Sequence, residues 1–217
     1  MMERVDKTTR MSGDERRIQL IKVAISLFSR KGFNGTTTKE IAESAGVSEA
    51  TLFKHFANKH ELYNAILDYK SCEAGIEQIF TLFEEAAQRD LDEKDVFYQM
   101  MLQILNYHEK DEEFLRLLLH SALDGHEFAQ LFVSRKIAPL YESMSHYING
   151  RQKKRILRGD LPARLIVRAF IGMLIHHSMN KLLWDKEQRL VKASNEEVAN
   201  VFSEILLSGI RNGDKKR

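Results

Sequence analysis

The chain has 217 residues and a mass of 25.2 kDa, with 43% hydrophobic and 29% charged residues and a formal net charge of +2. This length allows one large domain, or a small domain joined to a medium one, and the composition is typical of a helical protein. A single cysteine excludes an intramolecular disulfide, and the apolar stretch near residue 170 is interrupted by Arg168, His176 and His177, which excludes a membrane span.

Residues 1–12 are polar and charged and follow no helical or strand period, so we expect a flexible tail. They include no apolar segment of the kind that export signals carry, so we expect a cytoplasmic protein. The basic residues Arg4, Lys7 and Arg10 are suited either to solvent or to contact with a nucleic acid, and a solvated tail is the simpler expectation. Residues 1–60 contain 11 Lys and Arg against 7 Asp and Glu, so the small basic excess lies in this part of the chain.

The first predicted helix runs from about Ser12 to Lys31. Ser12 is followed three residues later by Glu15, which is the pattern of a capping box. Gly32 supplies a residue that readily ends a helix. The apolar residues at helical spacing predict a buried stripe made of Ile18, Ile21, Ala24, Ile25 and Phe28.

Two short helical patterns follow, with a Gly-Val-Ser corner between them. Thr37 and Glu40 have the spacing of a second capping box, and Gly46 can adopt the positive φ that ends a helix. Ser48 is a suitable N-cap for a helix that ends near His55 or Phe56. Residues 36–60 therefore predict a helix-turn-helix.

The second of these helices has an inward and an outward face. Leu52 and Phe56 are four residues apart, so they share one face and should be buried. At about 100° per residue, Ala50 and Lys54 then point away from Leu52. Small and cationic side chains on an exposed helix suit the major groove of DNA. The flanking residues of this face are Glu49, Thr51, Phe53 and His55.

The string T-T-x-x-I-A-x-x-A-G-V-S-x-x-T-L-F-x-H-F-x-x-K, from Thr37 to Lys59, resembles the DNA-binding signature of TetR-family transcriptional regulators. Two positions depart from it: Ala50 stands where the family often has Gly, and Phe53 where it usually has Tyr. Phe53 has no hydroxyl for a phosphate, but it can pack on a sugar or a thymine methyl. We expect DNA contacts from Thr37, Thr38, Lys39, Ser48, Glu49, Ala50, Thr51, Phe53, Lys54, His55 and Lys59.

A fourth helix is predicted from Lys59, because Asn58 and Glu61 form another capping box. Its free N–H groups and the Lys59 cation are suited to a phosphate. The helix should be long, with Gly75 marking a bend or a close approach of another helix. Beyond residue 90 the pattern continues as helices over about 93–108, 111–122, 125–156 with a kink or break at Pro139, 161–184 and 195–211.

These elements predict an all-α protein of about nine helices, the number typical of the TetR family. After the tail, a three-helix DNA-binding domain covers residues 13–58, and a regulatory and dimerisation domain covers 59–217. The last two long helices are apolar over more than one face, which predicts burial on two sides and a homodimer. The resemblance also implies dimerisation through these helices, and the expected interface residues are Leu165, Phe170, Met173, Leu174, Val198, Phe202, Ile205 and Leu206.

Large side chains are frequent between the fourth helix and these last two helices. A helical effector domain would use such residues to line an apolar cavity, although aromatics at helical spacing usually form core. The candidate cavity residues are Phe97, Tyr98, Met101, His108, His120, Phe128, Tyr141, His176 and Trp184.

The histidines and the short motifs of the sequence do not indicate a metal site or an enzyme. No two histidines are spaced i, i+4 on one helix, so no metal or other cofactor is expected. The sequence has no Walker loop, G-x-S-x-G, H-E-x-x-H or dinucleotide fingerprint, so we expect no enzyme activity.

The favoured hypothesis is a homodimeric regulator, most simply a repressor, that leaves a palindromic DNA operator when a small apolar or amphipathic ligand binds. The alternative is a helical metal or ligand carrier whose segment 36–60 serves a protein contact. An unrecognised helical enzyme is the third hypothesis. The sequence leaves open the effector, the operator sequence and whether the ligand releases or recruits the protein.

Overall fold

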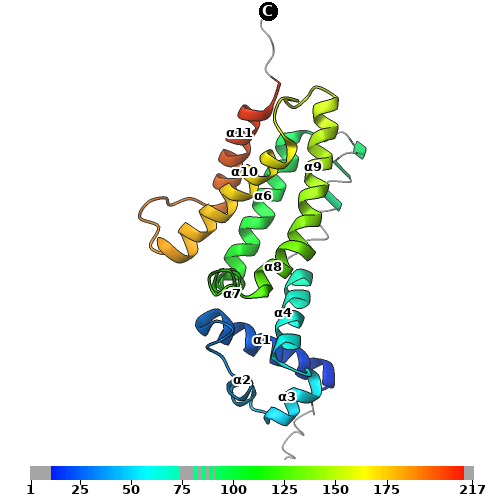
Figure 1. Cartoon of the computed structure of the whole chain (residues 1–217). Helices are drawn as coiled ribbons and strands as arrows, with labels where there is room; N and C mark the ends of the chain where they lie inside the picture. The colour runs from blue at the N-terminus through cyan, green and yellow to red at the C-terminus, as the bar shows by residue number, and fades with distance from the viewer. Residues whose placement is uncertain (1–10, 74–80, 83–84, 87, 90, 213–217) are drawn as a thin grey trace, which may run out of the picture.

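The computed structural model describes residues 11–73, 81–82, 85–86, 88–89 and 91–212. Helices α1, α2 and α3 lie at one end, and a bundle of longer helices that includes α6, α9, α10 and α11 lies at the other (Figure 1). The helices are α1 (Gly13–Lys31), α2 (Thr38–Ser44), α3 (Glu49–His55), α4 (Lys59–Glu73), α6 (Glu93–Lys110), α7 (Glu112–Leu123), α8 (Glu127–Phe132), α9 (Ala138–Lys153), α10 (Ala163–Met179) and α11 (Asn195–Ile210).

Two segments have the wider π-helical winding. Val133–Ile137 joins α8 to α9 without interruption, and Asn180–Trp184 extends α10. The elements named here therefore form nine continuous helical rods, residues 81–82, 85–86 and 88–89 are also helical, and the described residues contain no strand, which confirms the predicted all-α class. Pro139 is the second residue of α9, directly after the π-helical segment, and the helical rod continues through it. None of the described helices is long and apolar enough to cross a bilayer.

The ends of α1 are those that the sequence predicts. Ser12 Oγ accepts from the backbone N–H of Glu15 at 3.2 Å, and the Glu15 carboxylate accepts from Ser12 N at 2.7 Å. Gly32 ends the helix with φ of +69°. One residue of the predicted buried stripe is wrong, because Ile18 is 41% exposed. It lies in the second turn of α1, whereas Leu20 and Leu27 are buried because α4 and α7 both pack on this helix.

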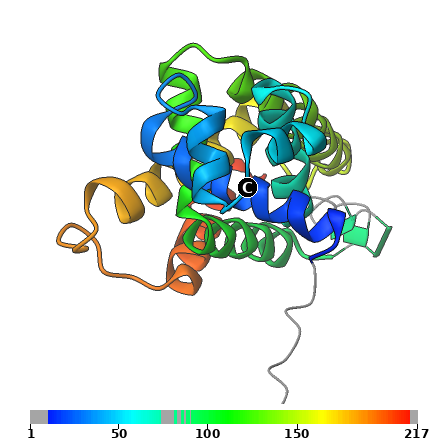
Figure 2. The same cartoon turned by 90° about the horizontal axis from the view of Figure 1, so that it is seen from below.

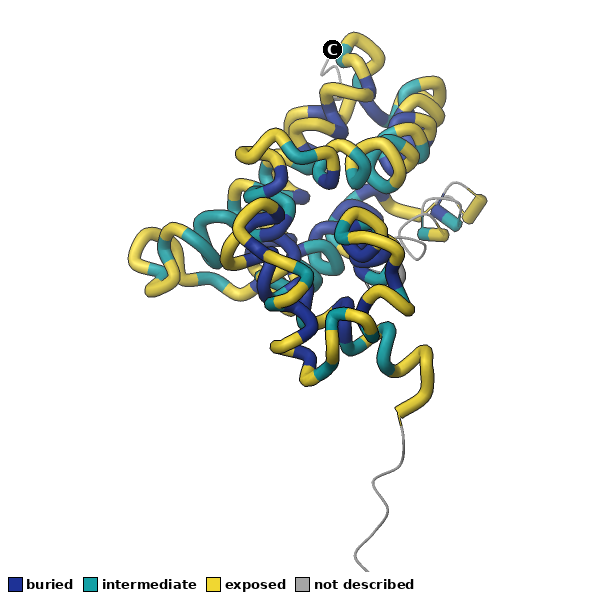
Figure 3. The backbone as a smooth tube through the Cα atoms, turned by 60° about the horizontal axis from the view of Figure 1, so that its bottom comes forward, coloured by how far each residue is buried: buried dark blue, intermediate teal, exposed yellow. Residues whose placement is uncertain are grey.

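Two hydrophobic cores hold the molecule together. Their buried residues are the dark blue stretches of the tube in Figure 3. The upper core joins α6, α9, α10 and α11. The lower core joins α1 to α4, and it also takes in Phe114 and Leu117 of α7 and Phe128 of α8. The helix-turn-helix is therefore supported by residues far beyond position 58, and α7 lies directly on α1.

Helix α4 connects the two ends of the molecule. Asn58 Oδ1 accepts from the Glu61 N–H at 2.9 Å, as the predicted cap requires, while the Glu61 carboxylate accepts from Ala57 N at 2.6 Å. Leu62 and Ile66 are fully buried in the lower core. The helix is described as far as Glu73, so the predicted bend at Gly75 lies outside the described residues.

Candidate DNA-binding surface and ligand cavity

Helix α3 presents the outward face that the wheel geometry predicts. Leu52 and Phe56 are fully buried, and Ala50, Phe53 and Lys54 are exposed. Phe53 keeps 44% of its surface in solvent, an unusual position for a phenylalanine in an isolated chain. Figure 2 views the molecule from the end that carries α2 and α3. This end of the molecule therefore presents an exposed helix surface that includes one aromatic ring and one cation.

Side-chain hydrogen bonds fix the start of α3 against α2. Ser48 Oγ accepts from Thr51 N at 3.2 Å and lies 2.9 Å from Thr51 Oγ1. Thr38 Oγ1 donates to a carboxylate oxygen of Glu49 at 2.5 Å. The four residues are predicted DNA contacts, and they form two hydrogen-bonded pairs. The Ser48–Thr51 pair caps α3, and the Thr38–Glu49 pair holds α3 at a fixed angle to α2.

The cap of α2 differs from the predicted box. Thr37 Oγ1 accepts from Glu40 N at 3.1 Å, but the Glu40 carboxylate does not return to Thr37. It pairs with Lys31 at the end of α1, and this bond lowers the pKa of Glu40. An opposite charge within reach is a better partner than a single backbone N–H. The interaction joins α1 to α2, which the local sequence pattern alone does not reveal.

Two α1 side chains that sequence reasoning missed close the other ends of the helix-turn-helix. Arg17 Nη1 donates to the carbonyl oxygen of His55 at 2.6 Å, and its guanidinium lies 4.3 Å from the ring centre of Phe56. Gln19 Nε2 donates to the carbonyl oxygen of Ala45 at 3.2 Å. The last carbonyl groups of a helix have no partner within that helix, so these contacts are C-terminal caps supplied from α1.

Lys59 is not directed outward as predicted. Its ammonium donates to the carbonyl oxygen of Phe33 and lies 4.0 Å from the centre of the Phe33 ring. Burial lowers the pKa of Lys59. The residue ties the start of α4 to the connection between α1 and α2, because that carbonyl and ring offer both a hydrogen bond and a cation–π contact. Lys39, in contrast, remains exposed, 4.0 Å from Glu43.

His126 packs where the lower core meets α8. Its Nδ1 accepts from Phe128 N at 3.3 Å, and its ring lies 4.1 Å from that of Phe33 and 5.7 Å from that of His60. Burial is the main cause that lowers the pKa of His126. Among the described residues, no three His, Cys, Asp or Glu side chains are grouped as metal ligands would be.

A cavity of about 120 Å³ lies between α6, α7, α9 and α10, and its surface is almost wholly apolar. Phe132 and Ile137, at the two ends of the π-helical segment Val133–Ile137, form part of the wall. π-Helical turns of this kind often accompany functional sites. The side chains with polar groups in the wall are Tyr107, His108 and Asp111, and the apolar ones include Ile104, Phe114, Leu115, Leu118, Leu140, Ile171, Leu174 and Ile175.

Of the nine predicted cavity residues, only His108 lies in this wall. The structure places the other eight outside this wall. Phe97 and Met101 fill the upper core and Phe128 the lower one, because aromatics at helical spacing pack inward. Trp184 is 63% exposed at the end of the extended α10. The rest are Tyr98 and Tyr141, half-buried on the upper core, His120, half-buried on α7, and His176, exposed beside Asn180.

His108 is held as a neutral ring. Its Nδ1 lies 2.8 Å from Ser178 Oγ, which anchors it to α10. Burial lowers the pKa of His108 to about 4. The cavity therefore has a hydrogen-bonding group at this point and no charge from the histidine near neutral pH.

Asp111 connects the cavity wall to α4. One carboxylate oxygen lies 2.6 Å from Lys70 Nζ, and both side chains are nearly buried, with 11% and 10% exposed. The same oxygen accepts from the Tyr107 hydroxyl at 3.2 Å, and the other accepts from Phe114 N as the cap of α7. A displacement of Asp111 therefore reaches Lys70 through a direct contact.

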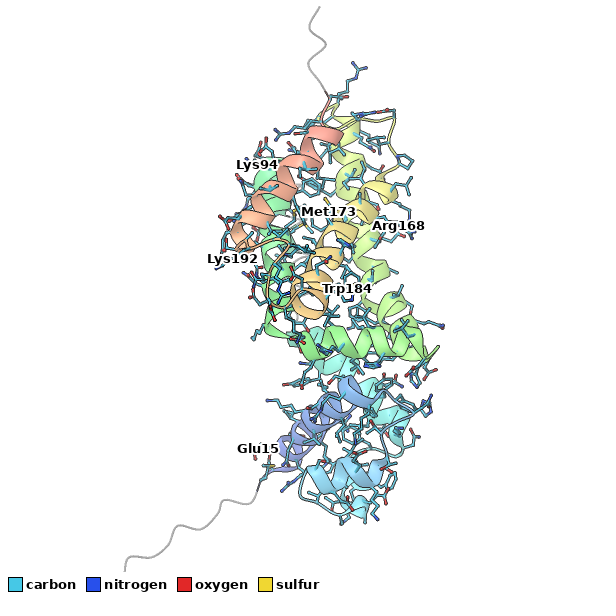
Figure 4. All side chains as sticks on the ribbon, turned by 90° about the vertical axis from the view of Figure 1, so that its left-hand side faces the viewer. Glu15, Lys94, Arg168, Met173, Trp184 and Lys192 are labelled. Atoms are coloured by element: carbon cyan, nitrogen blue, oxygen red, sulfur yellow. The ribbon has the colours of Figure 1, made fainter. Side chains whose placement is uncertain are left out.

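Helices α10 and α11 lie beside each other (Figure 4), and both carry exposed apolar residues that form the outward apolar face. Leu165 is 60% exposed, Ile205 58% and Val201 50%, and Met173 and Phe202 are half-buried beside them. The predicted interface is corrected for half of its members, because each helix must bury one of its two apolar sides within its own chain. Phe170, Leu174, Val198 and Leu206 lie in the upper core.

Comparisons with known proteins agree with this architecture. Residues 20–66 match the family model for bacterial regulatory proteins of the tetR family. The HTH-type transcriptional regulator YvkB of Bacillus subtilis is 47% identical over 57 residues, which are 26% of this chain and 30% of YvkB. The nucleoid occlusion factor SlmA of Glaesserella parasuis is 26% identical over 196 residues, which are 89% of this chain and 90% of SlmA.

The fold recurs in solved structures. The structure of the transcriptional regulator FadR from Bacillus subtilis, in complex with stearoyl-CoA, superposes with a TM-score of 0.67 at 19% identity and covers 89% of this chain and 99% of its own. The helix-turn-helix end, the helical bundle and the matched residues define a DNA-binding transcriptional regulator. The chain belongs to the TetR family.

Proposed function

We propose that the protein is a homodimeric repressor that dissociates from a palindromic operator when a small apolar or amphipathic ligand enters the cavity. In each subunit α3 lies in a major groove, with Ala50, Thr51 and Lys54 toward the bases. Thr37, Phe53 and His55 lie near the sugar-phosphate backbone of the DNA. One short helix reads few base edges, each worth about 1–3 kcal/mol, so two copies on two half-sites supply the specificity.

The single observation that carries the regulatory part is the contact between Lys70 and Asp111. Lys70 belongs to α4, which continues from the helix-turn-helix, and Asp111 belongs to the cavity wall. A ligand that moves the wall therefore moves α4 and changes the separation of the two α3 helices. Such a ligand acts only through its different affinities for the two separations.

The dimer in this proposal forms through the exposed face of α10 and α11. Isolated exposed apolar residues are common, but Leu165 of α10 and Val201 and Ile205 of α11 are exposed on two helices that pack against each other. A twofold axis through this face brings four helices into one bundle. FadR of Bacillus subtilis shares the fold and binds stearoyl-CoA, which supports an amphipathic effector here.

The test begins with selection of duplexes from a random library by the full chain. We expect a palindromic site whose affinity exceeds that of a scrambled duplex at every salt concentration. Binding to both duplexes should weaken as salt rises, since phosphate contacts release counterions. Equal affinity for the selected and scrambled duplexes at all salt concentrations would contradict the proposal.

The similarity to SlmA favours a second candidate, a DNA-binding factor that acts in nucleoid occlusion. The two candidates differ in where the protein lies on the chromosome. A repressor should occupy a few promoter-proximal sites, and a nucleoid occlusion factor should occupy sites spread over the chromosome. Chromatin immunoprecipitation of the full chain distinguishes them.

A further inference from the structure

A second cavity, of about 340 Å³, lies beside the apolar one, and three of its wall residues are lysines. They come from three different helices: Lys22 from α1, Lys70 from α4 and Lys110 from the end of α6. The two carboxylates in the wall, Asp111 and Glu113, leave one positive charge in excess. We call this cavity the lysine cleft.

Tyr107 and Asp111 form part of the wall of both cavities. One cavity offers apolar side chains, and the other offers ammonium groups. Where they meet, the carboxylate of Asp111 already neutralises Lys70 at 2.6 Å. A carboxylate or phosphate from a ligand can pair in the same way with the other two lysines of the cleft, Lys22 and Lys110, because it presents the same kind of oxygen atom to the same kind of cation.

From this arrangement we propose that the effector is a single-chain amphiphile with an anionic head, whose tail fills the apolar cavity and whose head lies in the lysine cleft. The inference rests on the proposed function and names the ligand class of that site. An engineered cavity of about 150 Å³ accepts benzene, so the present 120 Å³ holds a short part of a tail and longer chains displace the wall.

The head gives the ligand a second route to the DNA-binding end, beside the movement of the cavity wall. Lys22 lies on α1 of the helix-turn-helix end, and Lys110 lies on the bundle. An anion between them attracts both ammonium groups, so it links the two ends of the molecule directly. An uncharged amphiphile of equal length fills the apolar cavity without forming this link.

Isothermal titration of the full chain, without DNA, compares decanoate with decanol. We expect decanoate to bind more tightly, and we expect only its affinity to fall as salt rises. Acetate, which has the head without the tail, should bind far more weakly than decanoate. Equal affinities of acid and alcohol, or no effect of salt on the acid, would overturn the proposal, as would acetate binding as tightly as decanoate.

The double variant Lys22→Gln, Lys110→Gln removes the two exposed lysines of the cleft. We expect it to weaken decanoate about tenfold, the usual effect of losing a hydrogen bond to a charged group, and to leave decanol unchanged. Lys192→Gln, at an exposed lysine near the start of α11, is the matched control. Ile171→Trp, in the wall of the apolar cavity, should weaken acid and alcohol alike. Unchanged decanoate affinity in the double variant would overturn the lysine assignment.

The selected operator then separates this inference from the proposed function. Decanoate should lower operator affinity at concentrations at which decanol does not. If the chain binds its operator and neither compound binds the chain, the ligand class is wrong while the DNA-binding role stands. If the acid binds as described and no duplex is preferred, the site stands and the repressor role fails.

Discussion

Arg17 on α1 donates to the backbone carbonyl oxygen of His55, the last residue of α3, at 2.6 Å. Its guanidinium also covers the buried ring of Phe56. A helix of seven residues has little stability of its own, so its position depends on such contacts from a neighbour. The position of α3, the helix proposed to enter the major groove, thus depends on contacts from α1.

Arg17→Ala should lower the free energy of unfolding by about 1–3 kcal/mol, because it removes a charged hydrogen bond and leaves a partly buried carbonyl without its partner. Operator affinity should fall further than stability explains, since the end of α3 is released. Urea denaturation and fluorescence anisotropy measure the two effects. Arg30→Ala is the control, because Arg30 donates hydrogen bonds to Ser26 within its own helix.

Lys54→Ala should weaken operator binding about tenfold or more, as expected for one cation at a base or phosphate. Stability should stay within about 0.5 kcal/mol, because Lys54 is exposed on α3. Anisotropy titrations at several salt concentrations give the affinity and the number of phosphates contacted. Lys192→Ala, far from α3, should change neither, and a Lys54 variant with unchanged affinity would contradict the placement of α3.

His108 makes folding sensitive to acid. Burial lowers its pKa from 6.5 to about 4 in the folded chain, so between these values the unfolded chain binds the proton more readily. The free energy of unfolding is therefore highest with respect to His108 above pH 6.5. It decreases as the pH falls toward 4, by about 3 kcal/mol in all.

Chemical denaturation at a series of pH values measures this dependence. His108→Gln should have a flatter slope than the native chain between pH 4 and 6.5. His146→Gln, at an exposed histidine of α9, should retain the native slope. Identical slopes in all three proteins would show that His108 is not the group responsible.

Ile205→Asp places a charge in the middle of the outward face of α10 and α11. The residue is 58% exposed, so the subunit should still fold, while the proposed dimer should dissociate because a carboxylate cannot be buried there without a partner. Analytical ultracentrifugation gives the mass. Leu123→Asp changes a residue that is 86% exposed at the end of α7, and it should remain dimeric.

The sequence predicted the elements whose determinants are local. Helix caps at Ser12, Thr37 and Ser48 all form, and Gly46 has the expected positive φ. The outward face of α3 also follows from spacing within seven residues. In these cases the residues that decide the structure are within one or two turns of each other.

Contacts between distant segments escaped prediction. No local rule places Arg17 on the carbonyl of His55, turns Lys59 toward Phe33, or brings Lys70 to Asp111. The cavity was missed for the same reason. A wheel shows that an aromatic residue such as Phe97 is apolar, but only the packing of α6 against its neighbours decides between core and cavity wall.

The hydrogen bond from Lys59 to Phe33 joins the start of α4 and the helix-turn-helix into one rigid unit. Lys70 lies eleven residues along α4 from Lys59, roughly 16 Å at 1.5 Å per residue. A tilt of α4 at the Asp111 end therefore also moves α3, because both belong to this unit. Loosening the joint at Lys59 should yield a receptor that still captures its ligand but cannot transmit the event to DNA.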